Sequence, residues 1–142
     1  MRVLIDTNVI LDALVGRQPY FENADKIIKM CADKQIEGYL AAHSISNIFY
    51  ILRKDMTVDE RRAVLINLCN ILSIEDVDSA KVISALRNKE FEDLEDCLQD
   101  ECAIAVKANY IITRNMKDFS NSTVAAIIPE KFLLLMGDGG QE

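Results

Sequence analysis

The sequence predicts an α/β protein, a three-layer α/β/α sandwich around a central, mainly parallel sheet. Two observations lead to this fold class. Short apolar runs of strand length alternate with longer segments whose apolar residues have helical spacing, and polar residues follow directly where two of these runs end. Strands separated by helices pair in parallel through right-handed crossovers. With 142 residues, half of them hydrophobic, we expect one domain over residues 1–137 and a flexible tail over 138–142.

The first half of the chain predicts two strands and four helices. The opening apolar run stops at Asp6, after which apolar residues recur with helical spacing until Gly16 and Pro19 break the pattern. Thr57 and Glu60 match a capping box, which marks the start of another helix. In order, we expect a strand over 2–5, helices over 9–14 and 20–34, a strand over 38–42, and helices over 44–53 and from 57 onward.

The second half continues the alternation. Its strongest strand ends at Thr113, and Pro129 fits the first turn of a final helix. Because the carboxyl ends of parallel strands meet at one sheet edge, we expect Asp6 and Thr113 to lie side by side. In order, we expect a strand over 73–75, helices over 78–87 and 93–107, strands over 110–112 and 125–128, and a helix over 130–136.

Cysteine and histidine usage argues against several chemistries. The four cysteines form no CxxC pair, so we expect buried free thiols in a reducing cytosol. His43 is the only histidine, which argues against a Ser-His-Asp triad and against a zinc site with two histidines. No apolar run approaches the length of a bilayer span, and the opening segment does not resemble a signal peptide. We therefore expect a cytoplasmic protein with no membrane partner.

The net charge limits how the chain could meet a nucleic acid. Sixteen basic and 23 acidic side chains give a net charge of −7, which argues against a broad basic binding surface. A nucleic-acid enzyme is still compatible with this charge, because clustered carboxylates are negative by construction and divalent cations reverse their field.

Four aspartates are candidates for chemistry. Asp6 lies at the predicted carboxyl edge of the sheet, and Asp118 falls one turn past the strand over 110–112, as a loop cap or as a ligand facing the same cleft. Asp93 and Asp96 share one face in the first turn of a helix, where both could simply cap and charge that helix. Asp96 also lies close to the apolar side, where an unpaired carboxylate is costly unless it binds a cation.

Two amides and a hydroxyl extend this set of oxygen donors. Asn47 lies within an apolar helix and needs partners if it faces the core, whereas Asn115 could be a turn residue or an oxygen donor. Thr113 can orient a carboxylate or a water. Carboxylate, amide and water oxygens suit Mg²⁺ or Mn²⁺ rather than Zn²⁺. Such a site permits metal-assisted phosphodiester hydrolysis, in which the ion acidifies a bound water and polarises the phosphoryl group.

Four segments carry a resemblance to a known family. In this order and spacing, VLIDTNVILD, HSISNIFYILRK, DLEDCLQDECA and YIITRNMKDF resemble the PIN (PilT N-terminal) domain, and more narrowly its branch among VapC-like toxins of bacterial toxin–antitoxin systems. The resemblance covers nearly the whole chain. It implies an α/β/α sandwich, Mg²⁺- or Mn²⁺-dependent ribonuclease activity on an RNA substrate, a homodimer and a cognate antitoxin.

The resemblance also assigns residues. Asp6 and Asp96 match acidic catalytic and metal-binding positions of the family, and Asp118 is the nearby acid of the DF pair. The positions that would support the site are Thr7, Asn8, Asn47, Asp93, Thr113 and Asn115. Asn47 stands where many members have Glu, and Asn115 where many have Asp. Two fewer carboxylates weaken the grip on a hard cation, so we expect a site that binds one metal ion or binds metal weakly.

Three functions are compatible with these residues. The leading hypothesis is a metal-dependent endoribonuclease acting as a toxin, and the alternative is a catalytically weak or inactive PIN-like module that binds RNA or a protein partner. A phosphotransfer enzyme with Asp6 as nucleophile is disfavoured, because it would need a second aspartate where Asn8 stands.

Partner contacts can be placed only coarsely. RNA recognition would fall to a few basic groups, namely Arg17, Arg53, Lys54 and Arg114. The helices over 20–34 and 61–72 carry more apolar residues than one core face needs. These residues either form a groove for an antitoxin helix or a dimer seam, or pack within the chain.

Overall fold

The computed structural model describes residues 1–141, with side chains up to residue 137. Five strands, all paired in parallel, form one sheet in the order β3–β2–β1–β4–β5. The strands are β1 (Arg2–Ile5), β2 (Glu37–Ala41), β3 (Ser73–Glu75), β4 (Tyr110–Ile112) and β5 (Ala125–Ile127).

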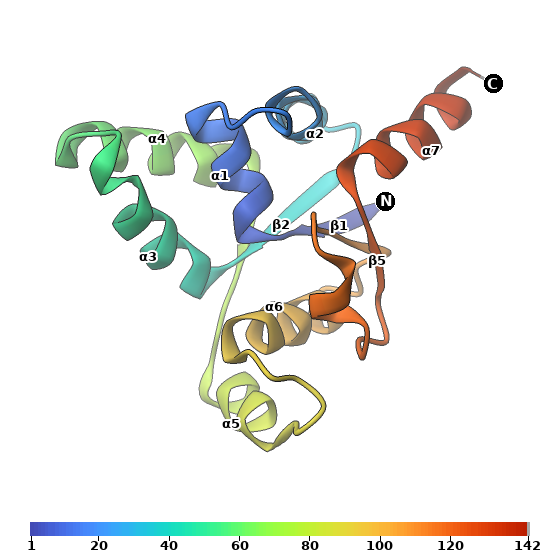
Figure 1. Cartoon of the computed structure of the whole chain (residues 1–142). Coiled ribbons are helices and arrows are strands. Elements are labelled where there is room, and N and C mark those ends of the chain that lie inside the picture. Colours follow the sequence, from blue (N-terminus) through green and yellow to red (C-terminus); the bar gives the residue numbers. More distant parts are fainter. Residues whose placement is uncertain (142) are drawn as a thin grey trace.

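Helices cover both faces of this sheet (Figure 1). On one face lie α1 (Thr7–Val15), α2 (Phe21–Ala32), α3 (Ala42–Ile51) and α4 (Val58–Ile71), with α7 (Pro129–Gln141) packed against α2. On the other face lie α5 (Ser79–Arg87) and α6 (Leu94–Ala105). Two short 3-10 helices complete the chain, η1 (Leu52–Lys54) and η2 (Met116–Phe119). The predicted three-layer α/β/α fold with a parallel sheet is confirmed.

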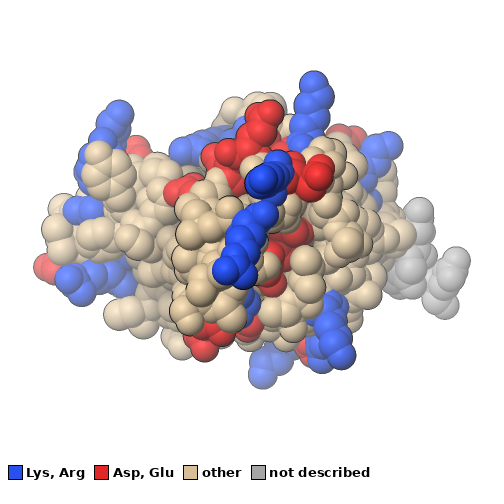
Figure 2. All heavy atoms as spheres, turned by 90° about the horizontal axis from the view of Figure 1, so that it is seen from below, with Lys and Arg blue, Asp and Glu red and all other residues tan. Residues whose placement is uncertain are grey.

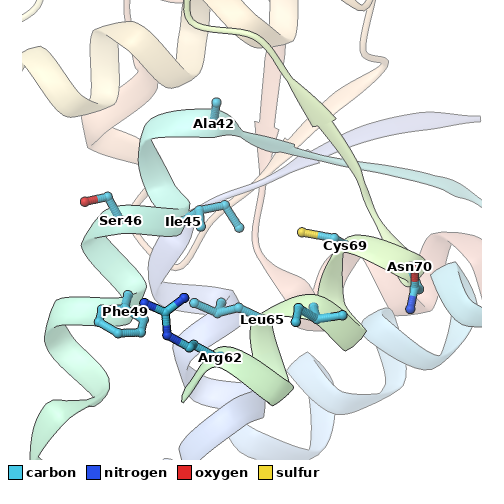
Figure 3. Close-up of a pocket in the computed structure, with 9 residues that line it drawn as sticks. Ala42, Ile45, Ser46, Phe49, Arg62, Leu65, Cys69 and Asn70 are labelled. Carbon is cyan, nitrogen blue, oxygen red and sulfur yellow. The ribbon is translucent and has the colours of Figure 1, made fainter. Parts of the chain in front are cut away.

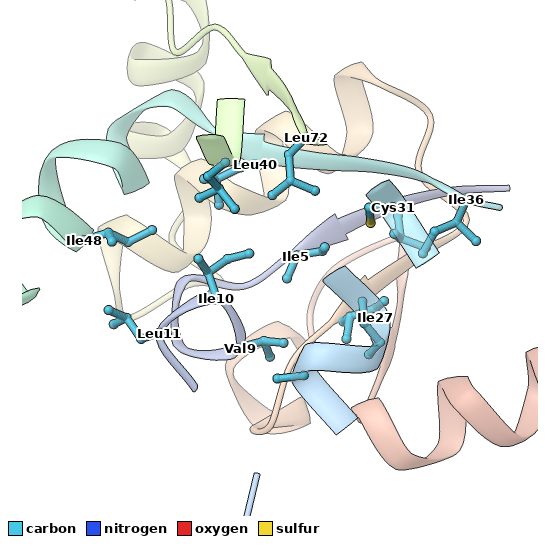
Figure 4. Close-up of a cluster of buried hydrophobic side chains, with 14 of the residues drawn as sticks. Ile5, Val9, Ile10, Leu11, Ile27, Cys31, Ile36, Leu40, Ile48 and Leu72 are labelled. Atoms are coloured by element: carbon cyan, nitrogen blue, oxygen red, sulfur yellow. The ribbon is translucent and has the colours of Figure 1, made fainter. Parts of the chain in front are cut away.

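Each central strand supplies both layers of the core through its two-residue period. Val3 and Ile5 of β1 belong to the larger cluster, where they meet side chains of α1, α2 and α3 (Figure 4). Leu4 points the other way and packs with Ala103 of α6 and Phe119 of η2. Strands buried on both faces explain why they occur in the sequence as unbroken apolar runs.

The helix starts follow from local side-chain chemistry. The capping box of α4 forms as predicted: the Thr57 hydroxyl accepts from the Glu60 amide at 3.2 Å, and the Glu60 carboxylate accepts from the Thr57 amide at 2.8 Å. The helix predicted over 44–53 begins two residues earlier and closes in η1. The predicted flexible tail over 138–142 stays a prediction, since its side chains and residue 142 lie outside the described residues.

The cysteine prediction is correct for three of four residues. Cys31, Cys97 and Cys102 are buried free thiols, whereas Cys69 of α4 is exposed. Of the helices described here, none is long and apolar enough to cross a membrane.

Candidate active site

The site lies at the point where the strand order changes from one side of β1 to the other. The first three strands run outward from β1 to one edge, and β4 then returns to the other side of β1. Ile5 pairs with Ile112, and the Asp6 amide donates to the Ile112 carbonyl at 2.9 Å. The carboxyl ends of β1 and β4 are therefore neighbours, as predicted. In parallel sheets such a switch point leaves a crevice in which ligands bind.

Asp6 is a buried carboxylate held at both oxygens. It is 5% exposed and occupies the N-cap position of α1. Gln99 Nε2 donates to Oδ1 at 3.0 Å, and Thr113 Oγ1 donates to Oδ2 at 2.8 Å. Burial raises the pKa of Asp6, these two hydrogen bonds oppose that rise, and the charge of Asp118 adds to it. The two donors fix the orientation of the carboxylate and favour its ionised form.

Gln99 is a site residue that the sequence analysis missed. It lies on α6, is 2% exposed, and its Oε1 also accepts from the Thr7 amide at 3.3 Å. The signal available in the sequence was its position three residues after Asp96, which puts both side chains on one helix face. Gln99 therefore connects α6 directly to the end of β1.

Asp96 is half-buried and electrostatically strained. Burial, and after it the negative charges of Asp93, Asp118, Asp6 and Glu95, together raise its pKa to about 7. Among the described residues, its carboxylate has neither a hydrogen-bond donor nor a Lys or Arg within ion-pair distance. Buried like charges without a counter-charge are the arrangement that a bound cation relieves.

Asp93 acts as the cap of α6. Its Oδ1 accepts from the Asp96 amide at 3.0 Å, so the capping interpretation holds for this residue. It contributes negative charge to Asp96 at the same time.

Asp118 is positioned by the loop after β4. Asn115 Nδ2 donates to Asp118 Oδ1 at 3.1 Å, and the Asn115 amide donates to Thr113 Oγ1 at 3.1 Å. Thr113 in turn donates to Asp6, so one series of hydrogen bonds joins Asp118, Asn115, Thr113 and Asp6. Asn115 thus holds an acidic residue in place through its amide nitrogen.

A cavity of about 290 Å³ opens between the start of α6 and η2. Its lining includes three of the predicted positions, Asp93, Asp96 and Asp118, together with one basic side chain, Lys117. The other lining residues are Glu90, Phe91, Glu92, Ser120 and Asn121. Asp6 lies outside this lining, yet its charge still acts on Asp96, so the acidic groups of β1, α6 and η2 share one region.

The oxygen atoms of the acidic side chains decide whether this site can hold a divalent cation. Within the described residues, no three His, Cys, Asp or Glu side chains gather closely enough to hold a metal ion by themselves. The oxygen chemistry nonetheless suits Mg²⁺ or Mn²⁺, since such ions keep several waters and need only one or two carboxylates. Asp96 and Asp118 line the open cavity, and Asp6, which lies outside its lining, adds to the negative charge that acts on Asp96.

Three predicted supporting residues lie at the periphery. Thr7 Oγ1 donates to Ser44 Oγ at 2.9 Å, which ties α1 to α3. Asn47 Nδ2 donates to Glu95 Oε2 at 3.1 Å, at the start of α6. Asn8 is exposed on the first turn of α1.

Arg114, which the sequence places among the basic groups for RNA recognition, has an acidic partner in the structure. It forms a two-pronged ion pair with Asp12, whose side chain is 1% exposed. The sequence hid this pair because 102 residues separate its members. Elsewhere, acidic and basic side chains lie interspersed on the face drawn in Figure 2.

Comparisons with known proteins agree with this architecture. A sequence model of the PIN domain matches residues 2–117. Among solved structures, VapC20 of Mycobacterium tuberculosis, described as a sarcin–ricin loop cleaving toxin, has a TM-score of 0.69 and 16% identity, over 89% of this chain and 99% of that one. A search among curated proteins gave no match.

Two further solved structures contain similar chains. VapBC2 of Rickettsia felis, bound to a DNA fragment from its promoter, gives a TM-score of 0.64 at 18% identity, over 90% of this chain and 98% of that one. FitAcB of Neisseria gonorrhoeae gives a TM-score of 0.64 at 18% identity with the same coverage, 90% and 98%. At these identities the likeness establishes the fold. Because the family match spans most of the sequence, this chain belongs to the PIN domain family.

Proposed function

We propose that this PIN domain is a Mg²⁺- or Mn²⁺-dependent endoribonuclease whose metal and catalytic residues are Asp6, Asp96 and Asp118. The observation that carries the proposal is a group of acidic side chains without a counter-charge: burial and nearby negative charges, including those of Asp118 and Asp6, raise the pKa of Asp96, and among the described residues no Lys or Arg forms an ion pair with any of the three. A site that concentrates negative charge at the sheet's switch point is suited to a hard cation and a phosphodiester.

Neighbouring polar residues would orient the acidic side chains. Gln99 and Thr113 hold the Asp6 carboxylate in one orientation, and Asn115 holds Asp118. When bound, the cation would acidify a water and neutralise charge on the phosphoryl group. Hydrolysis then adds the water oxygen to phosphorus and releases the 3′ oxygen of the RNA. Lys117, the one basic side chain in the cavity lining, would contact a phosphate of the entering strand.

The test is cleavage of a structured RNA with Mg²⁺ or Mn²⁺, comparing the wild type with Asp96→Asn. The matched control is Glu92→Gln, which removes the same formal charge from the lining of the same cavity. We expect metal-dependent cleavage by the wild type and the control, and at least a hundredfold slower cleavage by Asp96→Asn, on the order of the loss of one essential electrostatic group. Equal rates for Asp96→Asn and the wild type would refute the assignment.

The alternative function is a binding module without catalysis. It would show itself as RNA binding by the wild type without cleavage at any Mg²⁺ or Mn²⁺ concentration. The two amide substitutions at positions 47 and 115 motivate this alternative, because an amide cannot serve as a general base.

We further propose a partner protein, an antitoxin, for a groove between α3 and α4. This groove encloses about 650 Å³ and is lined mainly by apolar side chains, including Ile45, Phe49 and Leu65 (Figure 3). Ile66 at its edge is 66% exposed, and Arg62 contributes a positive charge. An amphipathic helix with an apolar face and acidic flanks suits this surface. The toxin–antitoxin complexes among the similar structures support this class of partner.

Co-expression with the product of an adjacent small open reading frame tests this partner. We expect the two chains to co-purify and Ile66→Arg to abolish co-purification without changing the melting temperature, because the side chain is exposed. Retention of the partner by Ile66→Arg would place the contact elsewhere. The predicted homodimer stays a prediction.

A further inference from the structure

The ion pair between Asp12 and Arg114 joins a buried carboxylate to a partly exposed guanidinium group. Arg114 Nε lies 2.8 Å from Asp12 Oδ2 and its Nη2 lies 3.3 Å from Oδ1, so the guanidinium fork meets both carboxylate oxygens. The ring of Tyr20 lies 4.2 Å from the guanidinium carbon. The two contacts with Asp12 and the stacking on the Tyr20 ring fix both the position and the plane of the guanidinium group. A lysine ammonium has no such plane and could not make both contacts at once.

This pair joins two of the three segments that carry the acidic site. Asp12 lies on α1, whose N-cap is Asp6. Arg114 lies between Thr113, which donates to Asp6, and Asn115, which donates to Asp118. The ion pair therefore fixes the segment after β4 to the same helix that presents Asp6.

We propose that Arg114 and Asp12 are positioning residues that set the placement of Asp118 and Thr113 relative to Asp6. The inference rests on the proposed function, since it concerns residues that would hold the cation. Neither member of the pair lines the cavity beside Asp96 and Asp118, so both act through the segment that Arg114 belongs to. Outer residues that orient metal ligands typically change metal affinity by 10- to 100-fold when replaced.

The sequence supplies a matched control within the same cluster. Arg17 Nη1 lies 3.7 Å from Asp12 Oδ1, yet Arg17 belongs to the turn after α1 and is not part of the segment after β4. Arg17→Lys makes the same chemical change beside Asp12 as Arg114→Lys, but it leaves the connection between α1 and the segment after β4 in place.

The experiment measures Mn²⁺ affinity by calorimetry and the melting temperature without metal for the wild type, Arg114→Lys, Arg17→Lys and Arg114→Ala. We expect about a tenfold weaker Mn²⁺ affinity for Arg114→Lys, and an affinity within about twofold of the wild type for Arg17→Lys. Guanidinium ion added far below denaturing concentrations should restore part of the affinity lost by Arg114→Ala.

The outcomes distinguish a failure of the positioning role from a failure of the proposed function. If the wild type binds Mn²⁺ and Arg114→Lys binds it equally well while melting earlier, the pair only stabilises the fold and the positioning role is overturned. If the wild type binds no Mn²⁺, the proposed function falls, and the positioning role falls with it.

Discussion

Asp96→Asn should make the metal-free protein more stable at neutral pH. Burial and neighbouring negative charges raise the Asp96 pKa from 3.8 to about 7, so the folded protein disfavours the ionised carboxylate. At about 1.4 kcal/mol per pKa unit, a rise of this size corresponds to an upper bound of roughly 4 kcal/mol. Asp96 is partly open to solvent, and screening reduces the expected gain in the free energy of unfolding to about 1–2 kcal/mol. For a domain of this size, that is about 3–6 °C in melting temperature.

The gain must depend on pH in a defined direction. Between pH 3.8 and about 7 the folded protein holds the Asp96 proton and the unfolded chain has released it, so wild-type stability falls as pH rises through this window. Thermal melts with a chelator at several pH values from 5 to 8 should therefore show Asp96→Asn gaining most at pH 8. The control Glu92→Gln should show a smaller change. The electrostatic explanation would be refuted if Asp96→Asn were less stable than the wild type at pH 8, or if its gain in melting temperature were the same at every pH.

Three further variants test separate parts of the structure by urea unfolding and Mn²⁺ titration. Gln99→Met removes the donor to Asp6 and should cost about 2 kcal/mol of stability and about tenfold in Mn²⁺ affinity; unchanged binding would contradict its role as a clamp. Thr57→Ala removes the capping box and should cost about 1 kcal/mol while Mn²⁺ affinity stays at the wild-type value; a weaker affinity would show an unexpected connection to the site. Gly38→Ala would place a Cβ 2.5 Å from the sulfur of buried Cys31, so we expect the free energy of unfolding to fall by about 1–3 kcal/mol. An unchanged free energy of unfolding would mean that the side chains around Gly38 can move aside without cost.

The fold could be predicted because its signals are local and repeated. Strands such as Tyr110–Ile112 are buried on both faces and therefore occur as apolar runs, and helix starts such as Thr57 have their own side-chain chemistry. Parallel pairing then follows from the alternation of strands and helices. The adjacency of Asp6 and Thr113 was predictable for the same reason, since both follow central strands.

The site could be predicted only in part, because its partners depend on tertiary placement. Which face of α6 points to β1 is set by packing, so the position of Gln99 three residues after Asp96 places both on one helix face but does not show that Gln99 holds Asp6. Arg114 and Asp12 are both charged, and nothing in their own segments indicates that they pair. Asn115 was assigned as an oxygen donor or a turn residue, whereas the structure uses its amide nitrogen to hold Asp118.

Counting bound Mn²⁺ by electron paramagnetic resonance shows whether Asp6 and Asp118 share one metal ion, with the wild type, Asp6→Asn and Asp118→Asn compared at one protein concentration. We expect saturable Mn²⁺ binding by the wild type and a marked loss in both variants, because residues far apart in the sequence would hold one ion. If both variants bind as much Mn²⁺ as the wild type, with the same affinity, the acidic groups at the ends of β1 and β4 do not form a shared metal centre.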